Sequence, residues 1–349
     1  MIDFTIGDEA RILLDAVDRF GQDRLAPAAR TAEAGRTPDS AARQLYEDLG
    51  LIGLELPGTG LGMIERVLVN EALGRADPGA ALALDRLGTG AYGLLAADDT
   101  PTAEAIAADP ARRAWLVTPE DGLLSVTERH ATGDVHFAPA GVTDLVVLCP
   151  TGIALIQQGL DAEPVRGGGL RATGPVRLRL DDVPVARFHR VATAPALARA
   201  RLYLASLLVG VLEAAAGYAR SYAMERVTFG KPIAHHQGLT FLLTDMNTAV
   251  TGCRLLVQEA AWRLDSGVGG PGAGIEAAAT AFAEAVDQSA FVGPAAVQVL
   301  GGLGFMQDYP VEKHMREARA IGLLCGGLDL AREDAMGEPA TALMAEGVF

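Results

Sequence analysis

Residues 298–313 read QVLGGLGFMQDYPVEK and lie in a C-terminal region that the sequence predicts to be helical from Pro195 onward. The helical spacing is clearest upstream, where apolar residues recur three and four positions apart: Met246, Ala249, Cys253, Leu256 and Ala260. A stripe with this spacing lies on one face of a helix and is typical of the core of a helical bundle. The glycine-rich segment 267–274 is predicted to be the loop that joins two such helices. We therefore expect a C-terminal four-helix bundle domain over residues 193–349.

Residues 1–112 are predicted to form an N-terminal helical domain. Apolar residues at helical spacing mark the first helix: Leu13, Ala16, Val17 and Phe20. A second helix is expected to end at Gly50, because glycine commonly stops a helix. The turn Gly58-Thr59-Gly60 then leads into a further helix over residues 63–74.

Residues 113–192 change to a period of two, which is typical of strands. The alternation is clearest at Val176, Leu178 and Leu180, which are separated by arginines. Short apolar runs at 145–148 and 153–156 are bounded by glycine and proline. This segment is predicted to be a small middle domain of antiparallel β-structure.

The composition of the 349-residue chain is that of a globular protein, with 50% apolar and 21% charged residues. The first residues are acidic and mixed, so no secretory signal is expected and a cytoplasmic location is predicted. The longest apolar run, residues 202–216, is interrupted by Ser206 and Glu213 and is shorter than the roughly 18 residues that a membrane span needs. We interpret it as a buried helix and expect no contact with a membrane.

The charge and the cysteines exclude several classes of site. A net charge of −15 argues against nucleic acid as a partner, because binding to phosphates needs a basic face. It does not exclude a coenzyme A ester, which needs only a few local cations. Cys149, Cys253 and Cys325 are widely separated, so neither a disulfide framework nor a metal site is expected.

Three motifs in the C-terminal half together resemble the acyl-CoA dehydrogenase family. They are RVTFGKPI at residues 226–233 with Gln237 just after it, QVLGGLGF at 298–305 and DYPVEK at 308–313. The predicted order of helices, strands and helices is also the order of that family, so the resemblance covers nearly the whole chain. It implies the acyl-CoA dehydrogenase fold and an FAD cofactor.

The resemblance also implies roles for particular residues. Arg226 carries a permanent cation at a turn of the backbone, where a guanidinium suits the FAD pyrophosphate. Phe229 would lie against the nucleotide, and Gln237 and Gln298 would hydrogen-bond its adenosine portion. Gly301 and Gly302 would let the main chain approach it closely. In the family these groups reach the FAD of a neighbouring subunit, so a dimer interface is implied as well. Taken singly, Arg226 could instead cap a helix and the glycines could be an ordinary loop.

The catalytic carboxylate of the family is missing from its expected position. Residues 316–332 read REARAIGLLCGGLDLAR, and Cys325 stands where the resemblance implies the Glu that removes the α-proton of the substrate. An unperturbed thiol has a pKa of about 8.5 and is a poor substitute, so Cys325 is interpreted as a small buried residue. Asp329 lies four residues later, predicted to be on the same helical face, and is either a replacement base or a solvated or capping residue. Some family members carry the base just before an arginine; here that pair reads Ala200-Arg201, and Arg201 is a candidate substrate contact.

The β region departs from the family at the flavin ring. Residues 117–123 read VTPEDGL and lack the Gly-Ser-Asp that the family places there. Ala138 supplies no hydroxyl to the flavin at the position where the family has Ser or Thr, and His136 replaces a tryptophan. His136 is interpreted as an exposed strand residue, with a role as base as the alternative.

The residues that would bind a neighbour's FAD are therefore present, whereas those that would hold this chain's own flavin and substrate are largely missing. A homo-oligomer would have every site half built, but a hetero-oligomer would not. We expect the FAD-completing subunit of a heteromeric acyl-CoA dehydrogenase, in a heterotetramer with a catalytic partner chain, of the kind that the family uses for bulky substrates such as steroid side-chain CoA esters. Two alternatives stay open: a self-sufficient flavoenzyme that uses Asp329 or Cys325, and a flavin-free scaffold or binding protein.

Overall fold

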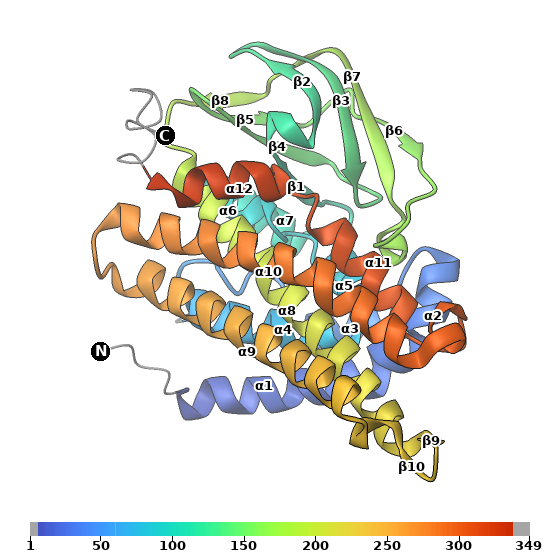
Figure 1. Ribbon diagram of the computed structural model, residues 1–349. Coiled ribbons are helices and arrows are strands. Elements are labelled where there is room, and N and C mark those ends of the chain that lie inside the picture. Colours follow the sequence, from blue (N-terminus) through green and yellow to red (C-terminus); the bar gives the residue numbers. More distant parts are fainter. Residues whose placement is uncertain (1–5, 60, 338–349) are drawn as a thin grey trace, which may run out of the picture.

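The computed structural model describes residues 6–59 and 61–337. Within them the chain forms a helical region, two small sheets and a second helical region, in that order (Figure 1). Gly60 of the predicted 58–60 turn, and the outer ends of the predicted terminal domains, lie outside the described residues. The division into domains at residues 112 and 192 stays a prediction.

The N-terminal region is helical, as the sequence predicts. The first helix, α1, buries Val17 and Phe20, and Asp39 caps α3 by accepting a hydrogen bond from the Ala42 N–H at 2.7 Å. The elements of this region are α1 (Asp8–Phe20), a π-helical turn (Gly21–Leu25), α2 (Ala26–Gly35), α3 (Ser40–Asp48), α4 (Met63–Ala76), α5 (Pro78–Leu84), α6 (Gly90–Ala96) and α7 (Thr100–Ala108).

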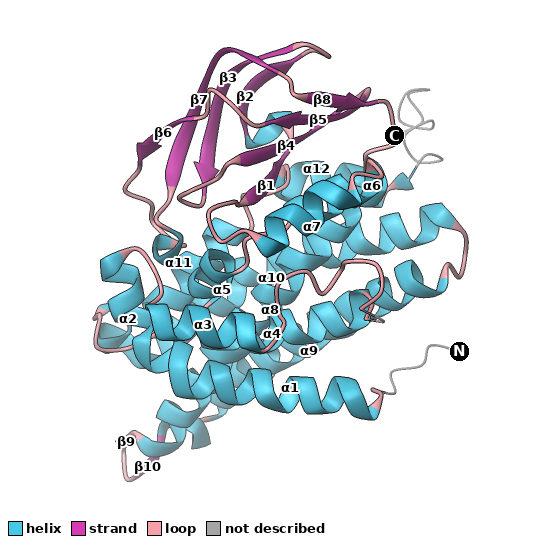
Figure 2. Cartoon of the chain, turned by 180° about the vertical axis from the view of Figure 1, so that it is seen from behind, coloured by secondary structure: helices cyan, strands magenta, loops and turns pink. Residues whose placement is uncertain are grey.

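The middle region contains two four-stranded sheets, and both lie on one side of the helices (Figure 2). One sheet has the order β1-β4-β5-β8 and the other β2-β3-β7-β6. The strands are β1 (Ala114–Val117), β2 (Gly122–Val126), β3 (His130–Ala138), β4 (Asp144–Cys149), β5 (Gly152–Ile156), β6 (Asp161–Pro164), β7 (Val176–Pro184) and β8 (Arg187–His189). Strands β4 and β5 are buried along their whole length, whereas Val176, Leu178 and Leu180 of β7 alternate with more exposed arginines.

The predicted antiparallel arrangement is wrong for one pair of strands. Strands β1 and β4 are parallel, with Ala114 opposite Asp144. The reason is that the chain leaves β1, forms β2 and β3 in the other sheet, and returns to β4 in the same direction. Local alternation of residues carries no information about such a return.

The C-terminal region is a bundle of long helices, which confirms the predicted fold class. Its helices are α8 (Ala194–Glu225), α9 (Gln237–Ser266), α10 (Pro271–Leu300), α11 (Val311–Ile321) and α12 (Gly327–Ala335). A short hairpin of β9 (Val227–Thr228) and β10 (Lys231–Pro232) and a 3-10 turn (Ile233–His235) join α8 to α9, and a 3-10 turn (Gly301–Phe305) follows α10. The loop between α9 and α10 is shorter than the predicted 267–274, because α10 already begins at Pro271, a residue type that suits the first turn of a helix.

Helix α8 is the central element of the bundle. Its most apolar window has a mean hydropathy of 1.6, and 78% of that window is buried inside the protein, which fits a core helix. It crosses α4 at a pair of glycines: a Cβ on Gly74 would lie 2.2 Å from the Leu207 carbonyl oxygen, and one on Gly210 would lie 2.1 Å from that of Glu71. Only glycine permits this approach, so the crossing locks the N-terminal region onto the bundle.

Candidate functional site

A cavity of about 400 Å³ lies where the β region meets the C-terminal helices. Its strand side includes the aromatic pair Trp115 and Phe137, whose ring centroids are 5.7 Å apart, together with Asp121 and His136. Its helical side is formed by the end of α11 and the turn before α12, including Cys325. The cavity therefore joins the two parts of the chain in which the sequence showed departures from the family.

Cys325 is buried in the wall of this cavity, with 3% of its surface exposed. Its φ of 54° is left-handed, and the turn that contains it separates α11 from α12. Burial raises the pKa of the Cys325 thiol well above its usual value; the negative charge of Asp121 raises the pKa further, and Arg201 opposes the shift. The thiol therefore stays protonated at neutral pH, and Cys325 cannot act as a ready base.

Asp121 brings a carboxylate to the same cavity, and the sequence analysis did not identify it. Its Oδ1 accepts a hydrogen bond from the Gly326 N–H at 3.0 Å, and its Oδ2 accepts one from the Thr118 N–H at 2.7 Å. Burial raises the pKa of Asp121, although these hydrogen bonds oppose the shift. The Thr-Pro-Glu-Asp sequence signals a capped turn, but nothing local signals the contact with Gly326.

Arg201 lies behind Cys325 and is engaged within the chain. Its Nη1 donates to Asp334 Oδ2 at 2.5 Å, and its Nε donates to the Cys325 carbonyl oxygen at 3.4 Å. Nη2 is buried and has no hydrogen-bond partner within the described residues. Arg201 is 1% exposed and does not line the cavity, so its role as a substrate contact stays a prediction.

Asp329 is not placed as the sequence analysis expected. Helix α12 begins only at Gly327, and the residues before it turn through positive φ angles, so Cys325 and Asp329 do not share a helical face. Asp329 is an exposed residue in the first turn of α12, where a carboxylate is favoured by the helix dipole. It lies outside the cavity lining.

On the strand side, His136 is exposed, as interpreted from the sequence, and it also lines the cavity. Ala138 is fully buried and does not line the cavity. The position that would hold a hydroxyl next to a flavin ring is thus occupied by a methyl group that packs into the core.

A second cavity, of about 540 Å³, shares Gly168, Gly169, Ala320 and Leu323 with the first. Its wall also contains Arg316 and Arg319 of α11. Arg316 fixes the glycine loop, because its Nη1 donates to the Gly168 carbonyl oxygen at 2.6 Å while it pairs with Glu33 and Glu312 at 2.7 Å each. The two cavities are therefore neighbours, one beside Cys325 and the other beside the cations of α11.

The six residues predicted to hold a neighbour's FAD all lie on the surface, and none lines the cavity beside Cys325. They fall into two groups. Arg226 and Phe229 lie in the connection between α8 and α9, and Gln237 is the first residue of α9. Gln298 lies in the last turn of α10, and Gly301 and Gly302 begin the 3-10 turn that follows it. Helices α8 and α10 both end on the side of the molecule that carries the β9–β10 hairpin (Figure 1).

Phe229 is the most exposed large apolar side chain among the described residues, at 92%. Its φ of 53° places it at the tip of the hairpin, beside Gly230 with a φ of 81°. Arg226 is exposed and makes no ion pair with the residues described. A Cβ at Gly230, Gly301 or Gly302 would meet no atom within 4 Å, so these backbones are open to a ligand or a partner. An aromatic ring and a free guanidinium on open backbone have the chemistry that suits a dinucleotide such as FAD.

Family models match both helical regions of the chain. The C-terminal domain of acyl-CoA dehydrogenase matches residues 189–336, and the N-terminal domain of acyl-CoA dehydrogenase matches residues 7–97. The chain belongs to the acyl-CoA dehydrogenase family. Proteins of this family are flavoproteins that use FAD and include oxidoreductases that act on acyl-CoA esters.

Similar curated acyl-CoA dehydrogenases cover nearly the whole chain. The cyclohex-1-ene-1-carbonyl-CoA dehydrogenase of Syntrophus aciditrophicus is 28% identical, over 93% of this chain and 88% of that protein. The mitochondrial short/branched chain specific acyl-CoA dehydrogenase of Bos taurus is 25% identical, over 93% and 83%. Among solved structures, butyryl-CoA dehydrogenase from Megasphaera elsdenii superimposes with a TM-score of 0.80 at 22% identity, over 98% of this chain and 100% of that one. The ChsE4-ChsE5 complex from Mycobacterium tuberculosis gives a TM-score of 0.80 at 22% identity, over 99% of both chains. At these identities the structural matches establish the fold alone.

Proposed function

We propose that this chain is the subunit of a heteromeric acyl-CoA α,β-dehydrogenase that completes the FAD site of a catalytic partner. The observation that carries the proposal is the state of position 325. A buried thiol with a raised pKa replaces the carboxylate that this chemistry requires. The chain thus keeps the fold without the usual base.

The residues that fit FAD support the same proposal. Arg226 would hold the pyrophosphate, Phe229 would lie against the nucleotide, and Gln237 and Gln298 would bond the adenosine portion. All four side chains are exposed, and none of them lines the cavity beside Cys325. A bound FAD would be the hydride acceptor for the substrate. This chain would contribute binding and orientation of the FAD. We propose that the backbone at Gly301 and Gly302 lies against the same FAD.

A heteromeric assembly has precedent among the similar structures. One is a ChsE4-ChsE5 complex, and another is described as a Tcur3481-Tcur3483 steroid acyl-CoA dehydrogenase. On this basis we propose a catalytic partner chain, a lipid or steroid CoA ester at the site of that partner, and a cytoplasmic complex.

The test is coexpression with a partner chain of the same family that bears the catalytic Glu. The isolated chain should be colourless and inactive, and the complex should contain about one FAD per heterodimer. The ratio of flavin absorbance to protein measures the FAD content, and turnover of acyl-CoA esters measures the activity. Replacing the partner's catalytic Glu by Gln should abolish turnover but keep the flavin. Stoichiometric FAD on the single chain, with turnover, would overturn the proposal.

One observation favours a second candidate, a self-sufficient enzyme with a different base. The Asp121 carboxylate lies in the same cavity as Cys325, and the neighbouring cavity is lined by Arg319. This candidate predicts that the isolated chain carries flavin and that Asp121→Asn abolishes its reduction by an acyl-CoA ester. Reduction that survives the substitution would exclude Asp121 as the base.

A further inference from the structure

The chain has two lysines, Lys231 and Lys313, among its 29 lysines and arginines. Lys313 is buried, and its Nζ donates to Asp77 Oδ1 at 3.0 Å and to Glu317 Oε1 at 2.9 Å. Burial alone would lower the pKa of Lys313, but these two carboxylates outweigh it and raise that pKa. The amine of Lys313 therefore stays protonated and is not available as a nucleophile.

Lys231 differs from Lys313 in burial and in partners. It is exposed on β10 and makes no ion pair with the residues described. Its Nζ donates to the carbonyl oxygen of His235 at 3.0 Å. A neutral amine can keep this bond through one N–H and still turn its lone pair to solvent. Because the three cysteines are buried, Lys231 is the one exposed amine or thiol side chain among the residues that the structure describes.

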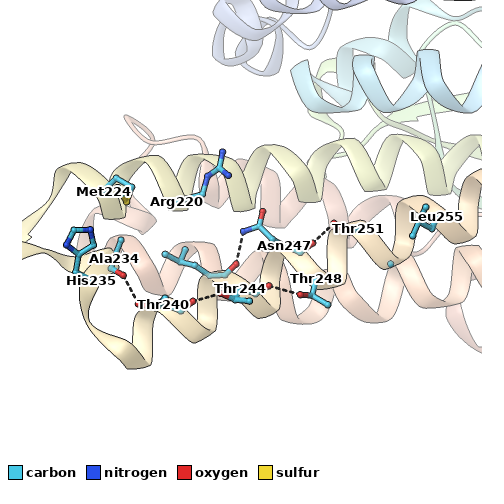
Figure 3. A pocket seen from close by; sticks show the side chains of 12 residues that line it. Arg220, Met224, Ala234, His235, Thr240, Thr244, Asn247, Thr248, Thr251 and Leu255 are labelled. Atoms are coloured by element: carbon cyan, nitrogen blue, oxygen red, sulfur yellow. Dashed lines mark hydrogen bonds between the residues drawn. The ribbon is translucent and has the colours of Figure 1, made fainter. Parts of the chain in front are cut away.

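The segment around Lys231 is locally basic. Residues 220–237 carry three cationic side chains, Arg220, Arg226 and Lys231, and one carboxylate, Glu225, in a chain with a net charge of −15. Both arginines are exposed and make no ion pair with the residues described. Figure 3 shows Arg220 on α8, where it lines a groove of about 690 Å³. The two guanidinium groups are therefore open to an anionic ligand.

The hairpin sets Arg226 and Lys231 on one face. Strands β9 and β10 are antiparallel, and Lys231 lies opposite Thr228. Arg226 has an extended backbone and precedes Thr228 by two residues, so its side chain points to the same face as Lys231. Coenzyme A carries a pyrophosphate and a further phosphate, which guanidinium groups bind well. An acyl-CoA ester attracted to these arginines would be concentrated beside the Lys231 amine.

The exposed ring of Phe229 lies close to the same segment. Its centroid is 6.2 Å from that of the His236 ring, and the two rings are nearly perpendicular. Lys231 Nζ bonds the carbonyl oxygen of His235, the residue before His236. An acyl chain attached to Lys231 therefore has an apolar surface within reach, and covering that surface removes apolar area from water. This ring is the one proposed to lie against the nucleotide.

We propose that Lys231 is acylated by acyl-CoA thioesters, and that the attached acyl chain covers Phe229 and prevents FAD from binding there. The amine attacks the carbonyl carbon of the thioester, the amide C–N bond forms and the C–S bond breaks. Coenzyme A leaves as the thiolate and takes up the proton that the nitrogen loses, so no oxidant or further reactant is needed. The effect on FAD rests on the proposed function, whereas the acylation itself does not.

The first test is acylation of the full isolated chain by butyryl-CoA, followed by peptide mapping with mass spectrometry. Lys231 should react faster than Lys313 by about tenfold or more, because Lys313 is reached only when the structure opens. Lys231→Arg should keep the charge and lose the modification.

The role of the arginines is tested with a thioester that lacks phosphates, butyryl-N-acetylcysteamine. Combining Arg220→Gln with Arg226→Gln should slow acylation of Lys231 by butyryl-CoA roughly tenfold and leave its reaction with the phosphate-free thioester unchanged. Equal rates at Lys231 and Lys313, or an equal effect of the two substitutions on both thioesters, would overturn the assignment of Lys231 as a site for coenzyme A esters.

The second test is the flavin content of the complex assembled after this chain has been acylated. The butyrylated wild type should lose its flavin. Lys231→Gln removes the charge without adding a chain and should keep its flavin, as should Lys231→Arg after treatment with butyryl-CoA. An acylated complex with as much flavin as the unmodified complex would overturn the inference. An unmodified complex without flavin would instead refute the proposed function, and with it the effect on FAD, while the peptide map still decides the acylation.

Discussion

Asp121 Oδ1 accepts a hydrogen bond from the Gly326 N–H at 3.0 Å, across 205 positions of sequence. This bond joins the strand side of the cavity to the start of α12 and holds the turn that buries Cys325. It also sets a carboxylate beside the thiol. Position 325, where the family has its Glu, is therefore held in place by an acidic residue from another part of the chain.

Removing the Asp121 carboxylate should make Cys325 more reactive. The charge of Asp121 raises the pKa of the thiol, so Asp121→Ala should lower that pKa, and the turn should open more often. Each unit of pKa changes the thiolate fraction about tenfold, and we expect alkylation by iodoacetamide to accelerate by about that factor. Mass spectrometry resolves the three cysteines. Cys149 and Cys253, whose pKa values are raised by burial to about 11 and about 12, should stay slow.

Glu120→Gln is the control for this experiment, because Glu120 also lines the cavity but bonds nothing across it. It should leave the rate at Cys325 near that of the wild type. An unchanged rate in a folded Asp121→Ala variant would show that the bond does not hold the turn.

Arg226→Ala should weaken retention of FAD in the assembled complex. A charge-assisted hydrogen bond to the pyrophosphate contributes roughly 1.5 to 3 kcal/mol, so we expect affinity to fall about tenfold or more. Folding should change little, because Arg226 is exposed and makes no ion pair with the residues described. Flavin absorbance after gel filtration is the measurement, and Lys231→Ala on the same hairpin is the control. Equal flavin occupancy in both variants would show that Arg226 does not bind the FAD.

Cys325→Glu should not turn the isolated chain into a dehydrogenase. Ala138 faces the core and the Gly-Ser-Asp segment is absent, so a flavin ring has no complete face beside position 325. Anaerobic mixing with FAD and a panel of acyl-CoA esters should leave the flavin oxidised. Bleaching by this single variant would show that the pocket is intact and that the subunit proposal is wrong.

The same variant makes a prediction about stability. Burial and Asp121 would raise the pKa of a carboxyl at position 325 above its value in the unfolded chain. The penalty for ionising it is therefore absent below about pH 4 and grows as the pH rises toward neutrality. Cys325→Glu should be less stable than Cys325→Gln at pH 7, and the two should converge near pH 4. Urea denaturation at both pH values measures this difference.

The ion pairs of Arg316 should hold α11 against α2 in a pH-dependent way. Burial alone would raise the pKa values of Glu33 and Glu312, but Arg316 and Arg30 outweigh it and leave both pKa values lowered. Because these pKa values are lower in the folded chain than in the unfolded chain, their contribution to stability is complete above about pH 5. It is lost as the pH falls through the folded-state pKa values.

We expect Arg316→Gln to cost about 2 to 3 kcal/mol at pH 7 and much less at low pH. The control is Arg332→Gln, which breaks an exposed pair with Asp287 and should cost about 0.5 kcal/mol or less. The midpoints of urea denaturation of the wild type and both variants, measured from pH 3 to pH 7, test this prediction. A cost for Arg316→Gln that does not depend on pH would contradict the assignment.

The sequence predicts the fold well because the relevant patterns are local. The stripe through Met246 and Cys253 does face the core, and the apolar run at 202–216 is the buried middle of α8. The errors concern contacts between distant segments. The parallel pairing of β1 with β4 depends on where the chain returns, and no residue in either strand encodes that.

The candidate site was less predictable for the same reason. The replacement of Glu at position 325 is visible in the sequence, but its consequence depends on three segments that meet there. Helical spacing placed Asp329 beside Cys325, although three successive residues with positive φ, from Cys325 to Gly327, break the helix between them. Asp121 belongs to a segment that departs from the family motif, and its contact with Gly326 joins residues that are far apart in the sequence.

Phe229 and Phe305 expose 92% and 75% of their surfaces to solvent in the single chain. Apolar surface of this kind favours aggregation and recognition by chaperones and proteases when nothing covers it. If the partner covers it, surplus copies of this chain would be short-lived in the cell. The two chains would then have to be synthesised in matched amounts, and the abundance of this subunit would follow that of its partner.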